Sequence, residues 1–464
     1  MREDLDSLLK PATVAVVGAS ANPGKLSNVA LRNLKTGHFK VYPINPRETE
    51  ILGLKCYPSV LVVPDRIDLA VISLQAEMVA GAVAECVRKK VGAVIVTASG
   101  FRESGREGAA REKELASMIR GKGTRVLGPN TMGVFSPVSG LDTFFIPRER
   151  SPRPGIGRIA MLSQSGAVSI SFLEKAAASG IGVSYCVGLG NKLDIDENEL
   201  TRRFGADEKT NCIAMYLESF SNGREFFEIA SGITPCKPVV VLKSGRTLAG
   251  VNAAGSHTGA IASSSDALVE KALHQAGVTR VYDEEELIDV AKALSFANCL
   301  KGDRICVVAS AGGFGVIASD LVESKEHGAG LRMARLSEET QERLRRVMPD
   351  FSSTRNPVDL TASVTDEMYD SVLQIVQRDH GVDGILMSLE LQPPNITKGL
   401  VEIAERRSSS KGARIVISAF GGDRTDAMLR EFSMKGVPAY PTIWRAARAL
   451  GALAQRGLHL NKRK

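Results

Sequence analysis

The chain has 464 residues, of which 44% are hydrophobic and 24% charged. This is an ordinary globular composition in a chain too long for a single core, so we expect three domains. The net charge is +7, but the basic residues are scattered and aromatic residues make up only 5%. The composition therefore indicates no nucleic-acid partner, and the positive bias better suits a polyanionic small molecule.

The seven cysteines form no CxxC pair, and several lie in apolar runs. This pattern favours free core thiols in a reducing cytosol and predicts no metal site. The start, Met-Arg-Glu-Asp-Leu-Asp, lacks the apolar segment of a signal peptide. No run of about 18 apolar residues is present, so we expect a cytoplasmic protein with no membrane partner.

Apolar runs of strand length alternate with helical stretches along the chain, which is typical of parallel sheets with crossover helices. We expect an α/β fold of three consecutive units, at 1–145, 155–298 and 301–464, and a linker at Pro147–Pro154. The expected strands are Val14–Val17, Lys40–Ile44, Leu69–Ile72, Ala93–Thr97 and Arg125–Leu127, then Arg158–Leu162, Gly182–Val187, Cys212–Leu217 and Pro238–Leu242, then Arg304–Ala309, Gly384–Ser388 and Arg414–Ala419.

The first expected strand runs into a turn of small residues, which favours a nucleotide at the strand end. A P-loop is excluded because Leu26 follows Lys25 and the glycine spacing is wrong, and GxGxxG is absent. Each strand-end residue alone is ordinary turn chemistry, but together they outline a crevice, and Lys25 either pairs with a phosphate or is solvated. The crevice residues are Gly18, Ala19, Ser20, Lys25, Asn45, Pro46, Ser99, Gly100 and Asn130.

A single histidine, His257, lies within the small-residue segment 250–262. Little side-chain bulk surrounds it, and a neutral imidazole is a competent nucleophile near neutral pH. The alternative is a surface loop histidine without a role. Glu218 ends an apolar strand, where a carboxylate either accepts from one imidazole nitrogen and fixes the tautomer, or is simply solvated. Lys243 closes the next expected strand and adds positive charge.

Two small-residue turns lead into expected helices, at Ser165-Gly166 and at Gly312-Gly313. The partial positive charge and the exposed backbone N–H groups of a helix start suit an anion, so the two helices are candidates to share one phosphate. Ordinary capping is the alternative. A hydrolase nucleophile elbow at Ser165 is excluded, because position 163 is serine.

These pieces, in this order, resemble the succinyl-CoA synthetase superfamily, and most closely the α subunit of NDP-forming (ADP-forming) acyl-CoA or acetyl-CoA synthetase. No single motif is specific, but the combination is, and it covers essentially the whole chain. The matching motifs are Val17-Gly-Ala-Ser20, Gly128-Pro-Asn130, Ser163-Gln-Ser-Gly166, Gly255-Ser-His257-Thr-Gly-Ala, Ala311-Gly-Gly-Phe-Gly315 and Asn356-Pro-Val-Asp359.

The resemblance implies three Rossmann-like or flavodoxin-like units with mainly parallel sheets. The first unit, 1–145, would bind CoA through the crevice residues. The second, 155–298, would be a ligase domain with the phosphohistidine loop, and 301–464 a second ligase domain. His257 would be transiently phosphorylated and oriented by Glu218. Ser165, Gly166, Gly312 and Gly313 would hold the phosphate.

The implied reaction is acyl-CoA + ADP + phosphate to carboxylate + ATP + CoA, through an acyl phosphate and phosphorylated His257. Acetyl-CoA, CoA and phosphate are the expected substrates. No segment looks like an ATP-grasp domain, so the resemblance implies a separate β subunit, an α2β2 assembly, and ADP or ATP with Mg²⁺ on that partner. One alternative is a non-catalytic, CoA-binding regulatory protein. A nicotinamide-linked dehydrogenase is less favoured, because Asn45 replaces the acid expected after the second strand.

Overall fold

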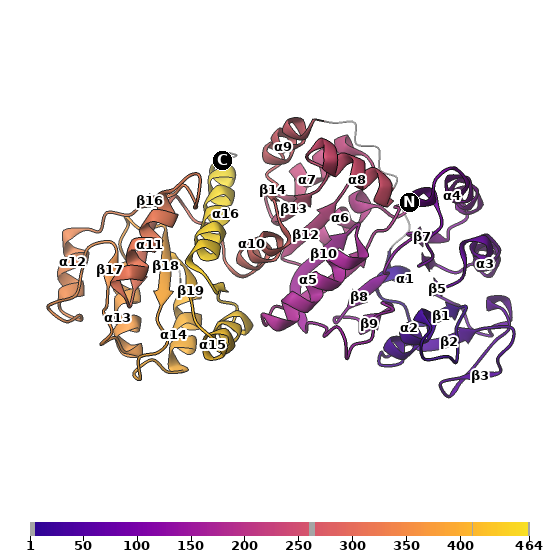
Figure 1. The fold of residues 1–464 in the computed structure, drawn as a ribbon, viewed down its shortest axis with the longest axis horizontal. Coiled ribbons are helices and arrows are strands. Elements are labelled where there is room, and N and C mark those ends of the chain that lie inside the picture. Colours follow the sequence, from indigo (N-terminus) through magenta and orange to yellow (C-terminus); the bar gives the residue numbers. More distant parts are fainter. Residues whose placement is uncertain (1–4, 259–264, 411, 463–464) are drawn as a thin grey trace. The chain divides into compact units, whose positions relative to one another are not determined.

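The structure, a computed structural model, describes residues 5–258, 265–410 and 412–462, and of residues 255–258 it describes only the backbone. These residues form an α/β fold with three main sheets of mostly parallel strands (Figure 1). The predicted fold class is therefore confirmed. Each expected strand is present, with its ends within about two residues of the expected ones.

The first sheet has five parallel strands in the order β2-β1-β5-β6-β7. The chain moves to one side of β1 to form β2 and then crosses to the other side, which makes the end of β1 a topological switch point. The elements are α1 (Asp6–Leu9), β1 (Thr13–Val17), α2 (Leu26–Leu34), β2 (Lys40–Ile44), β3 (Glu50–Ile51), β4 (Leu54–Lys55), η1 (Val60–Val62), β5 (Leu69–Ile72), α3 (Ala76–Lys89), β6 (Ala93–Val96), η2 (Arg102–Ser104), α4 (Arg106–Ile119) and β7 (Arg125–Leu127).

Both faces of this first sheet are buried, as expected for parallel strands. Alternate residues of β1 point to opposite sides: Ala15 joins the core beneath α3 and α4, whereas Val14 and Val16 join the larger core on the other side. Continuous Val, Ile, Leu and Ala runs are thus explained by burial on two faces.

The second sheet has seven strands in the order β14-β13-β12-β10-β11-β8-β9. All neighbouring pairs are parallel except β11–β8 and β8–β9, which are antiparallel and lie on one edge. The elements are β8 (Val134–Ser136), β9 (Leu141–Asp142), β10 (Ile156–Ser163), α5 (Gly166–Ala178), β11 (Val183–Gly188), α6 (Glu197–Gly205), β12 (Cys212–Leu217), α7 (Gly223–Ile233), β13 (Val239–Lys243), α8 (Leu248–Thr258), α9 (Asp266–Gln275), β14 (Thr279–Val281) and α10 (Glu284–Phe296).

The segment before residue 145 was expected in the first unit, but its two strands pair with the second sheet. The following stretch, expected to be a linker, is fastened down. Arg153 has a 5% exposed side chain and forms an ion pair with the fully buried Asp142 at 3.3 Å. Its guanidinium also lies over the rings of Phe135 and Phe144. Within the expected linker, Arg153 is thus a buried cation held by an acid and two rings.

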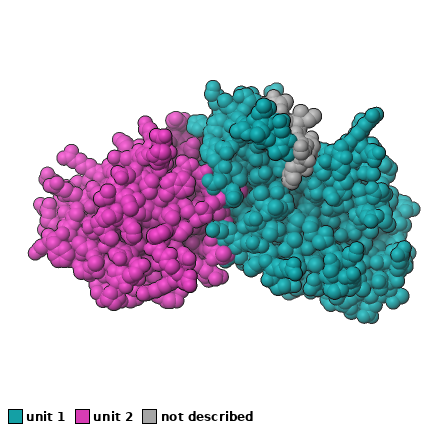
Figure 2. All heavy atoms as spheres, in the orientation of Figure 1, with its two compact units in different colours: residues 1–177, 182–284 teal, residues 178–181, 285–464 magenta. Residues whose placement is uncertain are grey.

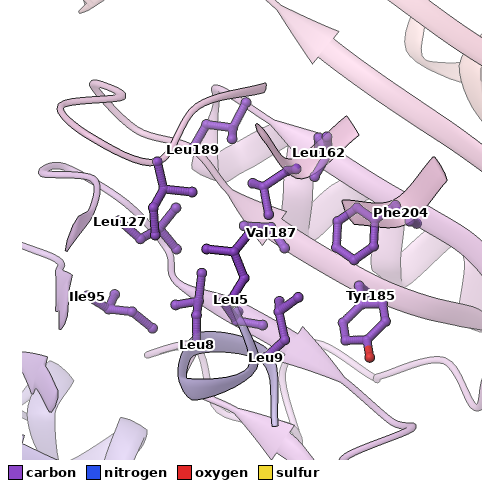
Figure 3. Close-up of a cluster of buried hydrophobic side chains, with 14 of the residues drawn as sticks. Leu5, Leu8, Leu9, Ile95, Leu127, Leu162, Tyr185, Val187, Leu189 and Phe204 are labelled. Atoms are coloured by element: carbon purple, nitrogen blue, oxygen red, sulfur yellow. The ribbon is translucent and has the colours of Figure 1, made fainter. Parts of the chain in front are cut away.

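The first two sheets share one hydrophobic core (Figure 3). The short helix α1 contributes Leu8 and Leu9, which are fully buried near Tyr185 of β11 and Phe204 of α6. Leu127 of β7 and Leu189 after β11 belong to the same cluster. This continuous core fixes the two sheets relative to each other.

The third sheet is built entirely of parallel pairs, in the order β16-β15-β18-β19-β20, with β17 also pairing with β15. The elements are β15 (Arg304–Ala309), α11 (Gly312–Glu323), β16 (Arg332–Met333), α12 (Glu338–Arg345), β17 (Val358–Asp359), α13 (Asp366–Val376), β18 (Gly384–Leu389), α14 (Gly399–Ser408), β19 (Arg414–Ala419), α15 (Asp423–Met434), β20 (Ala439–Tyr440) and α16 (Ile443–Asn461).

The chain divides into two compact units (Figure 2). The first comprises residues 1–177 and 182–284 and holds the first two sheets; the second comprises residues 178–181 and 285–464 and holds the third. Within the described ranges, no helix combines the length and apolar character needed to cross a bilayer.

Candidate active site where two sheet edges meet

The turn after β1 can be built only with glycine at position 18. Gly18 has φ +84°, and a Cβ there would lie 2.5 Å from the carbonyl oxygen of Ser73. Its neighbour Ala19 is tied to the end of β2, because the Asn45 side-chain amide donates to the Ala19 carbonyl at 2.8 Å. The two strand ends around the switch point are therefore locked together.

We expect Gly18→Ala to lower the free energy of unfolding by about 1–3 kcal/mol, because the methyl group overpacks the turn in addition to straining its backbone. Gly53→Ala is the matched control, since Gly53 has φ +76° but open space around its Cβ position. Denaturant unfolding checks the prediction. Equal losses in the two variants would show that the contact with Ser73 has no effect of its own.

Further predicted residues lie at the ends of β6 and β7. Glu103 accepts hydrogen bonds from the backbone N–H groups of Gly100 at 2.7 Å and Phe101 at 3.1 Å, which holds the turn after β6. Asn130 adopts φ +58°, and its N–H donates to the carbonyl of Ala98 at 2.9 Å. The turns after β6 and β7 are thus joined as well.

The other crevice residues expected from the sequence lie at the same edge. Ser20 accepts from the N–H of Asn22 at 3.2 Å, and its carbonyl accepts from the Asn28 side chain at 2.8 Å. Lys25 is exposed and immediately precedes α2, while Pro46 and Ser99 are exposed at their strand ends. The structure brings the predicted residues to one sheet edge, and their role in binding stays a prediction.

The start of α5 lies against this edge. A Cβ on Gly166 would come within 2.6 Å of Met132 Cγ, in the loop that follows Asn130. Ser165 is buried, and its Oγ lies 3.5 Å from the N–H of Val168, as a capping serine would. The capping alternative thus describes part of what Ser165 does, and the neighbouring helix start remains a candidate anion site.

Glu218 follows β12 and is 3% exposed. Its backbone N–H donates to Oε1 of Gln164 at 2.9 Å, and the same oxygen accepts from the N–H of Ser219 at 3.2 Å. The Tyr216 hydroxyl donates to the Glu218 carboxylate at 3.3 Å. The alternative of a solvated rim carboxylate is wrong, because the residue is buried, Gln164 holds its backbone and Tyr216 contacts its carboxylate.

Two buried lysines contact the carbonyls of this turn. Lys243 Nζ donates to the carbonyl of Glu218 at 2.7 Å, and Lys192 Nζ donates to the carbonyl of Ser219 at 2.7 Å. Burial lowers the pKa of both amino groups. Lys192 is also paired with the fully buried Glu197 at 2.9 Å.

His257 lies in α8, the helix that follows β13, and not in a loop as the small residues around it indicated. Its side chain lies outside the described residues, as do residues 259–262 of the expected loop. The helix is placed by Ala254, one turn earlier, which is 6% exposed. A side chain at Gly245 would meet Ala254 Cβ at 3.9 Å and Lys243 Nζ at 3.8 Å, so α8 runs beside the Glu218 turn.

The segment between β11 and α6, which we call the connector (residues 189–196), joins the two sheet edges. Its N–H groups at Asn191 and Leu193 donate to the carbonyls of Pro129 and Gly128, both at 2.9 Å. The Asn191 side chain donates to Glu103 at 2.7 Å. The crevice of the first sheet and the Glu218 turn of the second are therefore physically connected.

Gly312 and Gly313 begin α11 in the second compact unit and are exposed. A Cβ on Gly312 would lie 3.2 Å from the Asp359 carboxylate, whereas around Gly313 the space is open. A phosphate shared by this helix and α5 stays a prediction.

Sequence reasoning missed Gln164, Lys192 and Glu103 as parts of this site. Gln164 lies inside the motif Ser163-Gln-Ser-Gly166, whose serines and glycine are the residues that indicate a helix start. Lys192 follows Gly190-Asn191 after a buried strand, a turn signal like those used elsewhere in the chain. Their contacts are long-range, so the pattern alone did not reveal them.

The fold defines an α/β protein with two linked, mainly parallel sheets in one compact unit and a third in the other, and family models match along the chain. Family models match in three consecutive stretches: a CoA binding domain at 12–137, a succinyl-CoA ligase like flavodoxin domain at 156–294 and a ligase-CoA domain at 305–456.

Two curated relatives are each 36% identical to the chain and cover 97% of it. They are acetate–CoA ligase [ADP-forming] I of Archaeoglobus fulgidus, of which the chain spans 63%, and acetate–CoA ligase [ADP-forming] I subunit alpha of Pyrococcus furiosus, of which it spans 97%. The chain belongs to the family of ADP-forming acetate–CoA ligases and their alpha subunits.

A solved structure has the same fold over the whole chain. It is the dinucleotide forming acetyl-coenzyme A synthetase 1 of Ca. Korarchaeum cryptofilum in complex with phosphate and ADP. The TM-score is 0.89 at 34% sequence identity, covering 99% of this chain and 98% of that one.

Proposed function

We propose that this chain is the CoA-binding, histidine-phosphorylated subunit of an ADP-forming acetyl-CoA or acyl-CoA synthetase. One observation carries the proposal: the strand-end crevice of the first sheet and the Glu218 turn of the second are joined by the connector and lie in one compact unit. The names of the relatives support the same activity.

In this proposal CoA binds at the carboxyl edge of the first sheet. The turn at Gly18, Ala19 and Ser20 lies at the switch point, where α/β sheets bind phosphates, and it is held there by the N–H groups of Gly18 and Ala19, which donate to the carbonyl of Ile44. Lys25 adds a cation beside the start of α2. Asn45, Pro46, Ser99, Gly100 and Asn130 complete the edge, and its glycines admit the ligand close to the backbone.

The proposed reaction has three steps, and each is a nucleophilic displacement with its own leaving group. A phosphate oxygen attacks the thioester carbonyl and CoA leaves as its thiolate, giving an acyl phosphate. A nitrogen of His257 then attacks phosphorus, and the carboxylate leaves. Finally a terminal phosphate oxygen of ADP attacks the phosphorylated histidine, which forms ATP and returns the neutral imidazole.

The residues around Glu218 suit the second displacement. A carboxylate that accepts from one imidazole nitrogen fixes the tautomer and stabilises the positive charge that develops as the other nitrogen attacks. The start of α5 at Ser165 and Gly166, and in this proposal that of α11 at Gly312 and Gly313, would hold the phosphate. Glu218 is rigid enough for the role, because Gln164 and Lys243 fix its backbone.

A second subunit is part of the proposal. The chain spans 63% of one relative and 97% of another, and the name of the second includes "subunit alpha". We assign the ADP or ATP site, with its Mg²⁺, to a separate ATP-grasp β subunit, in an α2β2 assembly. The described residues hold no cluster of three metal-binding side chains. When bound, Mg²⁺ would neutralise the nucleotide phosphates.

We expect the purified chain to bind CoA but to form no ATP from acetyl-CoA, ADP and phosphate until an ATP-grasp subunit is added. Turnover assays with and without the partner check this, with mass spectrometry to exclude a co-purified partner. Labelled phosphate and acetyl-CoA, followed by mapping of the acid-labile phosphoresidue, test the histidine step. ATP formation by the chain alone would contradict the two-subunit assignment, and CoA binding without any phosphoresidue would favour a regulatory CoA-binding protein.

A further inference from the structure

The Glu218-Ser219 turn is held by ammonium groups on two consecutive carbonyls. Lys243 donates to the first and Lys192 to the second, each at 2.7 Å. Lys243 belongs to the adjacent strand β13, so its position follows from the sheet. Lys192 reaches the turn from the connector, and this position requires a buried charge on a residue with positive φ.

Three features make Lys192 unusual for a lysine. Its side chain is 3% exposed, in ion-pair contact with the fully buried Glu197. Burial lowers the pKa of its amino group, although Glu197 opposes that effect. Its backbone has φ +57°, a conformation that residues other than glycine seldom adopt. Buried charge and positive φ are both unfavourable, and such outliers concentrate at functional sites.

The connector also reaches the proposed CoA edge. Asn191, next to Lys192, is fully buried and donates to Glu103 at 2.7 Å and to Glu112 at 2.8 Å. Glu103 in turn holds the N–H of Gly100. Lys192 thus lies between the turn that bears Glu218 and the edge that bears Gly100 and Asn130.

We propose that Lys192 is a positioning residue that holds the Glu218 turn in register for phosphoryl transfer to His257. It acts through the carbonyl of Ser219 and touches no reacting atom. The inference rests on the proposed function. Because a displacement of about 1 Å can cost a hundredfold in rate, loss of the ammonium should slow the histidine step by about 10- to 100-fold.

The test uses the full chain with its partner and labelled acetyl phosphate as phosphoryl donor. The rate constant and the half-saturation concentration of acetyl phosphate are measured for formation of the acid-labile phosphohistidine, and CoA affinity is measured separately. Lys192→Met removes the ammonium but strands the buried Glu197. The double variant Lys192→Met/Glu197→Gln removes both charges. It keeps a side-chain oxygen to accept from the Ser221 hydroxyl, which donates to Glu197 in the structure.

Lys237→Met is the matched control. Lys237 also donates to two carbonyls, of Phe204 at 2.6 Å and Asp207 at 2.7 Å, and burial lowers its pKa as well. It lies ahead of β13, at the opposite end of the strand from the Glu218 turn. Lys237 is partly buried, and a general effect of losing an ammonium that bonds two backbone carbonyls would appear in this variant.

We expect the double variant to lose 10- to 100-fold in the rate constant, with half-saturation and CoA affinity within about twofold of wild type, and Lys237→Met to be unaffected. An unchanged rate constant overturns the inference. So does a parallel loss of CoA affinity or of cooperative unfolding, which assigns Lys192 to the fold. If the wild-type chain itself forms no phosphohistidine, the proposed function fails. That result differs from an unchanged rate constant in the variant and from a loss of CoA affinity or cooperative unfolding.

Discussion

Replacing His257 by alanine is expected to abolish ATP formation and the acid-labile phosphoprotein while leaving CoA affinity nearly unchanged. The proposed reaction has no second route for the phosphoryl group, because the histidine nitrogen is its only acceptor before ADP. CoA affinity should survive because the crevice residues belong to the first sheet, and His257 follows β13 of the second. Alanine is also the best helix former, so α8 is preserved.

The assays are turnover with the partner subunit, phosphoprotein labelling and CoA titration. His274→Ala is the control, since His274 is exposed on α9, the next helix. Retained turnover in His257→Ala would remove the phosphohistidine mechanism. Loss of CoA binding in the same variant would mean that α8 supports the crevice as well.

Glu218→Gln is expected to fold normally and to slow phosphohistidine formation by about a hundredfold, the scale of losing an acid–base partner. Glutamine fills the same volume and keeps an oxygen for the Tyr216 hydroxyl. The backbone bonds to Gln164 and Lys243 do not involve the side chain and should persist. What is lost is the charge that supports an imidazolium.

Rapid-quench labelling measures the rate, and thermal unfolding checks the fold. Glu228→Gln is the control, because Glu228 is an exposed carboxylate on α7 in a surface pair with Arg224. A surface pair of this kind contributes little to stability. Equal phosphorylation rates for Glu218→Gln and wild type would give Glu218 a purely structural role.

The long apolar runs of the parallel strands made most of the fold predictable. The residues of β6, for example, are all buried and form a continuous hydrophobic segment. Such a segment can be recognised without knowing the rest of the fold. The short strands β8 and β9 were missed, because strands of two or three residues carry no periodicity of their own. They are defined by pairing, of β8 with β11 and of β9 with β8.

The histidine segment shows why composition alone can mislead. Gly250 and Gly255 each cost about 1 kcal/mol relative to alanine in a helix, so the segment reads as a loop. In the structure Thr247 accepts from the N–H of Gly250 at 3.1 Å, and the buried Ala254 anchors the helix. Packing of one face thus overrides a weak local preference.

The site was predictable where it rests on strand ends and not where it rests on distant contacts. Gly18, Asn45 and Asn130 follow buried strands, and parallel sheets bring such positions to one edge. The bond between Lys192 and Ser219 spans 27 residues of sequence and depends on the path of the connector. No local signal encodes that path.

Strands β8 and β9 follow the first sheet in the sequence but belong to the second sheet. This limits where the chain can be divided. A break near residue 145 would leave residues 134–142 on the fragment whose own sheet ends at β7. The other fragment would expose the edge of β11, all of whose residues are buried. Unprotected edges of that kind pair with other chains and aggregate. A cut before β8 would keep each strand with its own sheet, but it would still divide the core that the two sheets share.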